Sequence, residues 1–164
     1  MDFNIPVRRM RYKDGREVPL RGDDFIGVGH DEQERLRLLK GEAKSRRMLG
    51  RTTISEAREA LNRNDGRCTP SSLLFVANQL LERDDDDAEL GRAIRNEVAQ
   101  RALPPSRLDH VLFTMSGNSP PEALRADLEA ADPGRNHTVI NLRIENHQEF
   151  IAETYEEAGN LGND

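Results

Sequence analysis

Residues 69–81, TPSSLLFVANQLL, form the most apolar stretch of the chain and dominate the fold prediction. Thr69 stands where a helix N-cap is expected, and Pro70 suits the first helical position because its missing backbone N–H would find no partner there. From Leu73 to Leu81, apolar side chains cover most of the helix circumference. A helix that is apolar nearly all round is typical of a buried core helix, and we predict one here.

Similar start signals lie on both sides of this stretch. Each combines a short polar residue, typical of an N-cap, with Glu three residues later and an apolar stripe at helical spacing. The residues that open these predicted helices are Asp31, Thr53, Asp86, Ser119 and Asn146. A seventh helix is predicted from Ser106, where Leu108, Val111, Leu112 and Met115 would share one face.

Two segments are predicted to be extended. Residues 9–20 alternate around Asp14-Gly15, which predicts a β-hairpin because a tight hairpin turn favours Asp-Gly. Residues 138–145 alternate apolar and polar side chains and predict a strand, which should pair with the hairpin or with another copy of the protein. The predicted class is α+β and mainly α, with six or seven short amphipathic helices, an N-terminal hairpin and one C-terminal strand. The predicted division is an extended segment at 1–30, a helical domain at 31–158 and a frayed tail at 159–164.

Composition excludes several classes of protein. The 164 residues include 33% charged side chains, the mean hydropathy is −0.78, and no apolar run approaches the roughly 20 residues of a membrane span. A single cysteine, Cys68, cannot form an internal disulfide framework. No secretory signal is recognisable at the N-terminus, so the expected location is the cytoplasm.

Charge is distributed unevenly along the chain. Residues 1–68 contain 16 Lys and Arg against 12 Asp and Glu, whereas residues 69–164 contain 8 against 18. Because the two halves carry opposite net charge, we expect head-to-tail contact between copies of the chain. The basic half favours contact with nucleic acid. A helix-turn-helix DNA-binding motif is also weakly matched by two predicted helices, one over Thr53–Arg63 and one from Pro70, and by the turn between them. The predicted nucleic-acid or partner contacts are Arg35, Lys40, Lys44, Arg46, Arg47, Arg51 and Arg67, and the predicted self-association residues are Ile140, Leu142 and Ile144.

No motif in the sequence points to a particular reaction. The four histidines lack metal-ligand spacing, and the run Asp84–Asp87 lacks the glycine of a calcium loop, so we predict no metal site and no cofactor. Gly27-Val28-Gly29 precedes carboxylates that would repel a phosphate. Cys68 is predicted to be structural. The sequence therefore predicts a protein that is not an enzyme.

The functional hypothesis is a non-catalytic, homo-oligomeric assembly or adaptor subunit whose basic N-terminal half contacts nucleic acid. Its organisation resembles that of small viral packaging or assembly subunits, an analogy of layout that implies protein subunits as partners and no membrane. Two alternatives remain open. One is a protein-binding structural subunit without a nucleic-acid role, and the other is an enzyme whose site is assembled from scattered residues.

Overall fold

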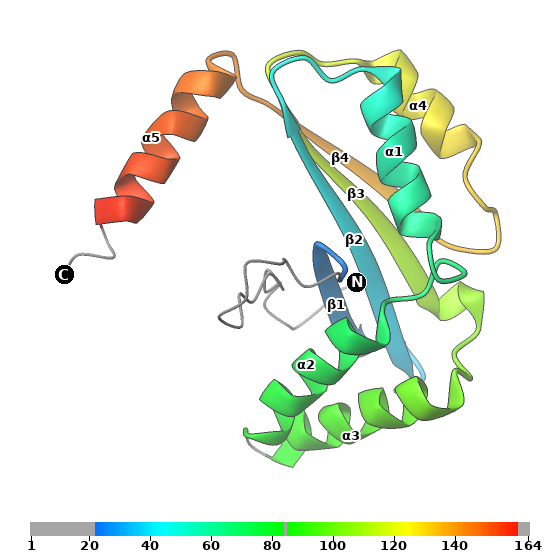
Figure 1. The fold of residues 1–164 in the computed structure, drawn as a ribbon. Coiled ribbons are helices and arrows are strands. Elements are labelled where there is room, and N and C mark those ends of the chain that lie inside the picture. Colours follow the sequence, from blue (N-terminus) through cyan, green and yellow to red (C-terminus); the bar gives the residue numbers. More distant parts are fainter. Residues whose placement is uncertain (1–21, 84, 161–164) are drawn as a thin grey trace.

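The computed structural model describes residues 22–83 and 85–160, which form one four-stranded sheet and five α-helices (Figure 1). In chain order the elements are β1 Phe25–His30, β2 Leu36–Arg46, α1 Arg51–Asn62, α2 Pro70–Leu81, α3 Asp85–Gln100, a 3-10 turn at Pro105–Arg107, β3 Leu108–Ser116, α4 Pro121–Glu129, β4 His137–Arg143 and α5 His147–Asn160. The strands lie side by side in the order β1-β2-β3-β4.

The sheet is mixed. β1 and β2 form an antiparallel hairpin, while β2, β3 and β4 run parallel to one another. A parallel connection needs a crossover, and here α1, α2 and α3 lie between β2 and β3, and α4 between β3 and β4. β2 has 11 residues against six in β1, so its last residues continue past the end of its antiparallel neighbour.

Helices α1 to α4 all cover the same face of the sheet, and this face carries two separate cores (Figure 1). In the lower core, α2 and α3 pack on β1, β2 and the start of β3 through residues such as Leu38, Leu80 and Ile94. In the upper core, α1 and α4 pack on β3 and β4 around Leu112 and Leu61. The two cores follow from the strand alternation, which sends every second side chain to the covered face.

A polar row separates the two cores on this face. Lys40, His110 and His137 lie next to one another on β2, β3 and β4. The turn after α1 crosses this row, and three of its residues, Asn64, Asp65 and Gly66, have positive φ. The Lys40 Nζ donates to the Arg63 carbonyl at 2.8 Å, and the His110 Nε2 lies 2.8 Å from the Gly66 carbonyl, so these two buried side chains fix the turn to the sheet.

The five helices predicted from Thr53, Pro70, Asp86, Ser119 and Asn146 are confirmed as α1 to α5. At α2 the predicted cap is also confirmed, since the Thr69 hydroxyl accepts a hydrogen bond from the Ser72 backbone N–H. At α1 the N-cap is Gly50, three residues before the predicted Thr53.

The predicted fold class is wrong. The helix predicted from Asp31 is instead the strand β2, and the helix predicted from Ser106 is the strand β3, so the described residues contain five helices and not six or seven. In both segments the apolar residues fit a helical period, but pairing within a four-stranded sheet prevails over that local pattern. Between residues 22 and 160, leaving out 84, no helix is long and apolar enough to cross a membrane.

The predicted strand at 138–145 is confirmed as β4, and in the structure it pairs with β3, a strand that the sequence analysis predicted as a helix. Pairing of β4 with another copy of the protein stays a prediction. The hairpin predicted at 9–20 lies outside the described residues. The division at residue 30 stays a prediction, and in the structure it falls in the short turn between β1 and β2.

Candidate active site

Two carboxylates face each other where β1 begins. Phe25 pairs with Gly41, so one step further out Asp24 lies opposite Glu42, and both side chains are on the covered face. The Asp24 Oδ2 accepts a hydrogen bond of 3.0 Å from the Ala43 backbone N–H, which holds the carboxylate against the edge of β2. Gly41 permits this arrangement, because the Phe25 ring lies where a Cβ at position 41 would be.

A lysine completes the group two residues further along β2. Lys44 and Glu42 point to the same face because strand side chains alternate, and the Lys44 Nζ donates to the Glu42 Oε1. Their side chains are 23% and 13% exposed, so the group is half-buried but open to solvent. Burial raises the pKa of the Glu42 carboxyl; the Lys44 hydrogen bond opposes this, and the nearby Asp24 adds to it. We refer to Asp24, Glu42 and Lys44 as the carboxylate–lysine site.

A second, more deeply buried pair supports this site from below. Lys40 is 3% exposed, its Nζ lies 3.8 Å from the Asp23 Oδ1, and burial lowers the pKa of its ammonium group. Asp23 in turn accepts a hydrogen bond from the Thr69 backbone N–H at the start of α2. This pair therefore joins the hairpin to the helices and holds the base of the site in place.

The donor set of the site fits one kind of metal ion. In the described part of the chain no three His, Cys, Asp or Glu side chains gather, so an all-side-chain cage of the zinc or calcium type finds no support there. Two carboxylates do meet, and the Ala43 carbonyl points to the same side of β2 as its N–H, toward Asp24. Mg²⁺ is commonly held by one or two carboxylates, with waters and substrate phosphates completing its shell. Asp24 and Glu42 are therefore suited to hold such an ion.

The structure separates the predicted contact residues into two groups. Four of them bind an acidic side chain or a distant carbonyl: Arg35 with Asp31, Lys40 with the Arg63 carbonyl, Lys44 with Glu42, and Arg67 with Glu97 and the Leu103 carbonyl. The other three are exposed and close together in sequence, at the end of β2 and the start of α1. We call Arg46, Arg47 and Arg51 the arginine group.

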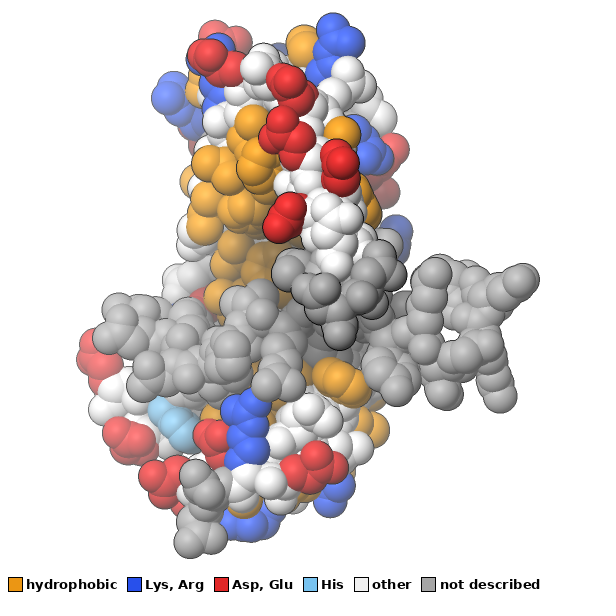
Figure 2. Space-filling view, turned by 90° about the vertical axis from the view of Figure 1, so that its left-hand side faces the viewer, with side chains coloured by type: hydrophobic (Ala, Val, Ile, Leu, Met, Phe, Trp, Pro, Cys, Tyr) orange, Lys and Arg blue, Asp and Glu red, His pale blue; other side chains and the backbone are white. Residues whose placement is uncertain are grey.

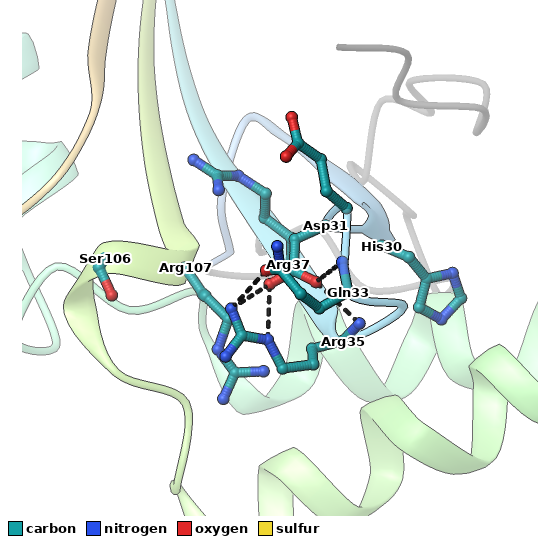
Figure 3. A pocket seen from close by; sticks show the side chains of 8 residues that line it. His30, Asp31, Gln33, Arg35, Arg37, Ser106 and Arg107 are labelled. Atoms are coloured by element: carbon teal, nitrogen blue, oxygen red, sulfur yellow. Dashed lines mark hydrogen bonds and ion pairs between the residues drawn. The ribbon is translucent and has the colours of Figure 1, made fainter.

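An open basin of about 630 Å³ lies at the tip of the hairpin, and it contains the predicted contact Arg35 (Figure 3). Its cations are satisfied within the protein. Arg35 binds Asp31 and holds the pKa of that carboxyl down at about 2, while Arg37 makes a two-pronged ion pair with Asp109 at 2.6 and 2.7 Å. The Arg107 guanidinium donates to the Leu36 carbonyl. These pairings make the basin a structural feature of the hairpin.

The predicted self-association residues lie on or next to β4. Ile140 and Leu142 are 46% and 45% exposed on the face of the sheet opposite α1 to α4, and Ile144 is half-buried just after the strand. Cys68 is 2% exposed, and burial raises the pKa of its thiol far above the ordinary value, consistent with the structural role predicted for it.

The sequence analysis missed Asp24 and Glu42. Their signal was an acidic residue at the start of an extended segment, followed 18 positions later by Glu42-Ala43-Lys44, an acid and a lysine separated by one residue. This spacing places acid and lysine on one face of a strand but on different faces of a helix. The helix predicted from Asp31 concealed it.

Fold and site together define an α/β protein with a mixed sheet, helices on one face and a carboxylate–lysine site at the edge of its hairpin. The sequence model of the HamA family matches residues 2–158. The chain belongs to the HamA family. Among curated proteins, none matches the chain.

Proposed function

We propose that this protein hydrolyses phosphodiester bonds of nucleic acid with the help of a divalent cation. The observation that carries the proposal is the meeting of Asp24, Glu42 and Lys44 at the open end of the hairpin. The geometry favours the second alternative from the sequence, an enzyme with a site built from scattered residues. The prediction of a protein without catalytic activity stays untested.

Each member of the site has a distinct task in this reaction. The Asp24 and Glu42 carboxylates would hold Mg²⁺, an ion commonly bound by one or two carboxylates together with substrate phosphates. When bound, the ion polarises the phosphate and lowers the pKa of a coordinated water. Lys44, whose ammonium lies beside Glu42, stabilises the negative charge that develops on the phosphate oxygens. A water oxygen forms the new bond to phosphorus and releases a proton to solvent, while the bond to the leaving sugar oxygen breaks and that oxygen takes up a proton from solvent.

The arginine group supports nucleic acid as the substrate. Arg46 lies two residues beyond Lys44 on the same face of β2, a step of about 6.6 Å along the strand. Arg46, Arg47 and Arg51 are exposed. Arginine binds phosphate in a two-pronged geometry and remains charged at every physiological pH. A phosphate chain that binds these arginines would thus extend toward the carboxylates.

The test combines metal binding with cleavage. Calorimetry with Mn²⁺ alone should detect binding to the full chain, and Asp24→Asn or Glu42→Gln should abolish it. Labelled duplex DNA, single-stranded DNA and RNA, incubated with Mg²⁺ or Mn²⁺, should show cleavage that falls by about 10²-fold or more in either variant. Lys44→Met should keep the Mn²⁺ binding but lose the cleavage, which separates its task from that of the carboxylates.

A matched control is Glu89→Gln, which removes an exposed carboxylate on α3 and should change neither measurement. The proposal is wrong if the wild-type chain cleaves none of the three substrates with either cation. Cleavage that survives unchanged in Asp24→Asn and Glu42→Gln would also contradict it, since the activity would then come from elsewhere.

The assembly or adaptor subunit predicted from the sequence remains the second candidate. It is supported by the apolar face of the sheet that α1 to α4 leave uncovered, where Ile140 and Leu142 are exposed. Partner subunits and a cytoplasmic location stay part of this proposal. Light scattering tests it, because an assembly subunit should have a mass above 18.6 kDa in solution.

A further inference from the structure

The uncovered face of the sheet is apolar over its upper half. By strand alternation it presents Val111, Phe113 and Met115 of β3 together with Ile140 and Leu142 of β4. Figure 2 views this side of the molecule and shows a continuous hydrophobic patch next to a column of acidic side chains. A patch of this kind on a protein surface is typical of a contact site. We call these five residues the open face.

Helix α5 begins on the same side of the sheet but stands away from it (Figure 1). Its first residue, His147, is buried, with its Nε2 2.8 Å from the hydroxyl of Ser45, a residue on the uncovered side of β2. Beyond this anchor Ile151 is half-buried, while Phe150 and Tyr155 are exposed, at 40% and 71%. An isolated helix of 14 residues is only marginally stable in water, so α5 needs an apolar surface to cover.

The open face and α5 match in size and character. At 1.5 Å per residue α5 is about 21 Å long, and at 3.3 Å per residue β4 is about 23 Å long, so the helix can span the whole face. The apolar side of α5 is backed by four glutamates and no lysine or arginine. Exposed Arg47, directly after the end of β2, offers these glutamates a charge of the opposite sign.

We propose that two copies of this chain exchange α5, so that the apolar side of each α5 lies on the open face of the other copy. Within one chain the buried His147 ring and the three-residue connection 144–146 fix the start of α5, and from that start the helix leads away from its own sheet. Reciprocal exchange buries both of these apolar surfaces and gives a closed two-fold pair. Because the exchange occurs twice, the pair buries two helices on two open faces, twice the contact of one helix on one sheet.

Sedimentation of the full chain gives the first test. The wild type should have about twice the monomer mass of 18.6 kDa, and both Leu142→Asp on the open face and Tyr155→Glu on α5 should return it to the monomer. Leu128→Asp is the matched control, because Leu128 is similarly exposed, at 41%, but lies on α4 behind the sheet, and it should leave the dimer intact. Circular dichroism confirms that the variants fold. A wild-type chain that sediments as a monomer overturns the proposal.

Cross-linking identifies which chain provides the helix. One chain carrying Leu142→Cys is mixed with another carrying Tyr155→Cys, and the mixture is oxidised. Exchange of α5 predicts a disulfide between the two different chains. The native Cys68 is buried and should not take part. If the double variant on one chain instead forms the disulfide within a monomer, α5 covers its own sheet and the exchange is wrong. This inference does not depend on the hydrolytic site, since mass and cross-linking report the exchange while metal binding and cleavage report the site.

Discussion

His110 should make this protein less stable in mildly acidic solution. The ring is 1% exposed, its Nε2 lies 2.8 Å from the Gly66 carbonyl, and its Nδ1 has no hydrogen-bond partner among the described residues. A second proton would therefore add a buried charge. Burial lowers the pKa of His110 to about 4 from an ordinary value of 6.5.

The sign and size of the effect follow from proton linkage. Between pH 6.5 and 4 the unfolded chain binds a proton at this residue and the folded chain does not, so the free energy of unfolding falls as the pH falls. The full difference of 2.5 pKa units corresponds to about 3.4 kcal/mol at 1.36 kcal/mol per unit. Between pH 7 and pH 5, where most carboxylates remain ionised, His110 alone should lower the free energy of unfolding by about 1.8 kcal/mol.

Urea unfolding at pH 7 and pH 5 measures this cost. His110→Gln keeps an N–H that can donate to the Gly66 carbonyl but cannot be protonated, so its loss of stability between the two pH values should be smaller than that of the wild type by about 1.8 kcal/mol. His30→Gln, at an exposed histidine, is the matched control and should follow the wild type. If His110→Gln loses as much stability as the wild type, the buried neutral ring is not the cause and the reasoning fails.

Three further predictions concern packing and charge. Leu80→Ala, at a core residue 3% exposed, should lower the free energy of unfolding in urea by about 2–5 kcal/mol, and a change below about 0.5 kcal/mol would mean that α2 does not pack inward. Gly41→Ala should cost about 1–3 kcal/mol because its Cβ would overlap the Phe25 ring, and a thermal midpoint equal to that of the wild type would contradict this. Changing the whole arginine group to Ala should reduce the salt dependence of nucleic-acid binding by about three units, close to one per phosphate contact, equally on every sequence. If the triple change instead alters only the oligomeric mass, these arginines bind carboxylates of a neighbouring copy.

Helices with clear end signals could be predicted from the sequence, and the long-range strands could not. Thr69 and Pro70 act within their own turn, so α2 was found with its cap. β2 was mistaken for a helix because its covered face holds Lys40, Glu42 and Lys44, charged residues that hide the apolar–polar alternation of a strand. Their burial depends on partners far away in the sequence, such as the Arg63 carbonyl.

The same cause concealed β3 and the candidate site. In β3 both faces carry apolar residues, Leu112 toward the helices and Phe113 on the open face, so the period of two is weak. Asp24 and Glu42 meet only because β1 and β2 form a hairpin, and the hairpin could not be predicted while β2 was read as a helix. The sequence groups these basic residues together, but only the three-dimensional structure shows which of them bind acidic side chains or distant carbonyls, namely Arg35, Lys40, Lys44 and Arg67.

The polar row of Lys40, His110 and His137 between the two cores also bears on how the chain opens. Apolar packing links α2 and α3 to the lower core and α1 and α4 to the upper core, while the boundary is crossed mainly by hydrogen bonds to the turn after α1. Protection against hydrogen exchange should therefore fall into two cooperative units along the same sheet, each with its own opening free energy. Since the carboxylate–lysine site lies next to this boundary, partial opening of one unit would loosen the site well before the chain unfolds as a whole.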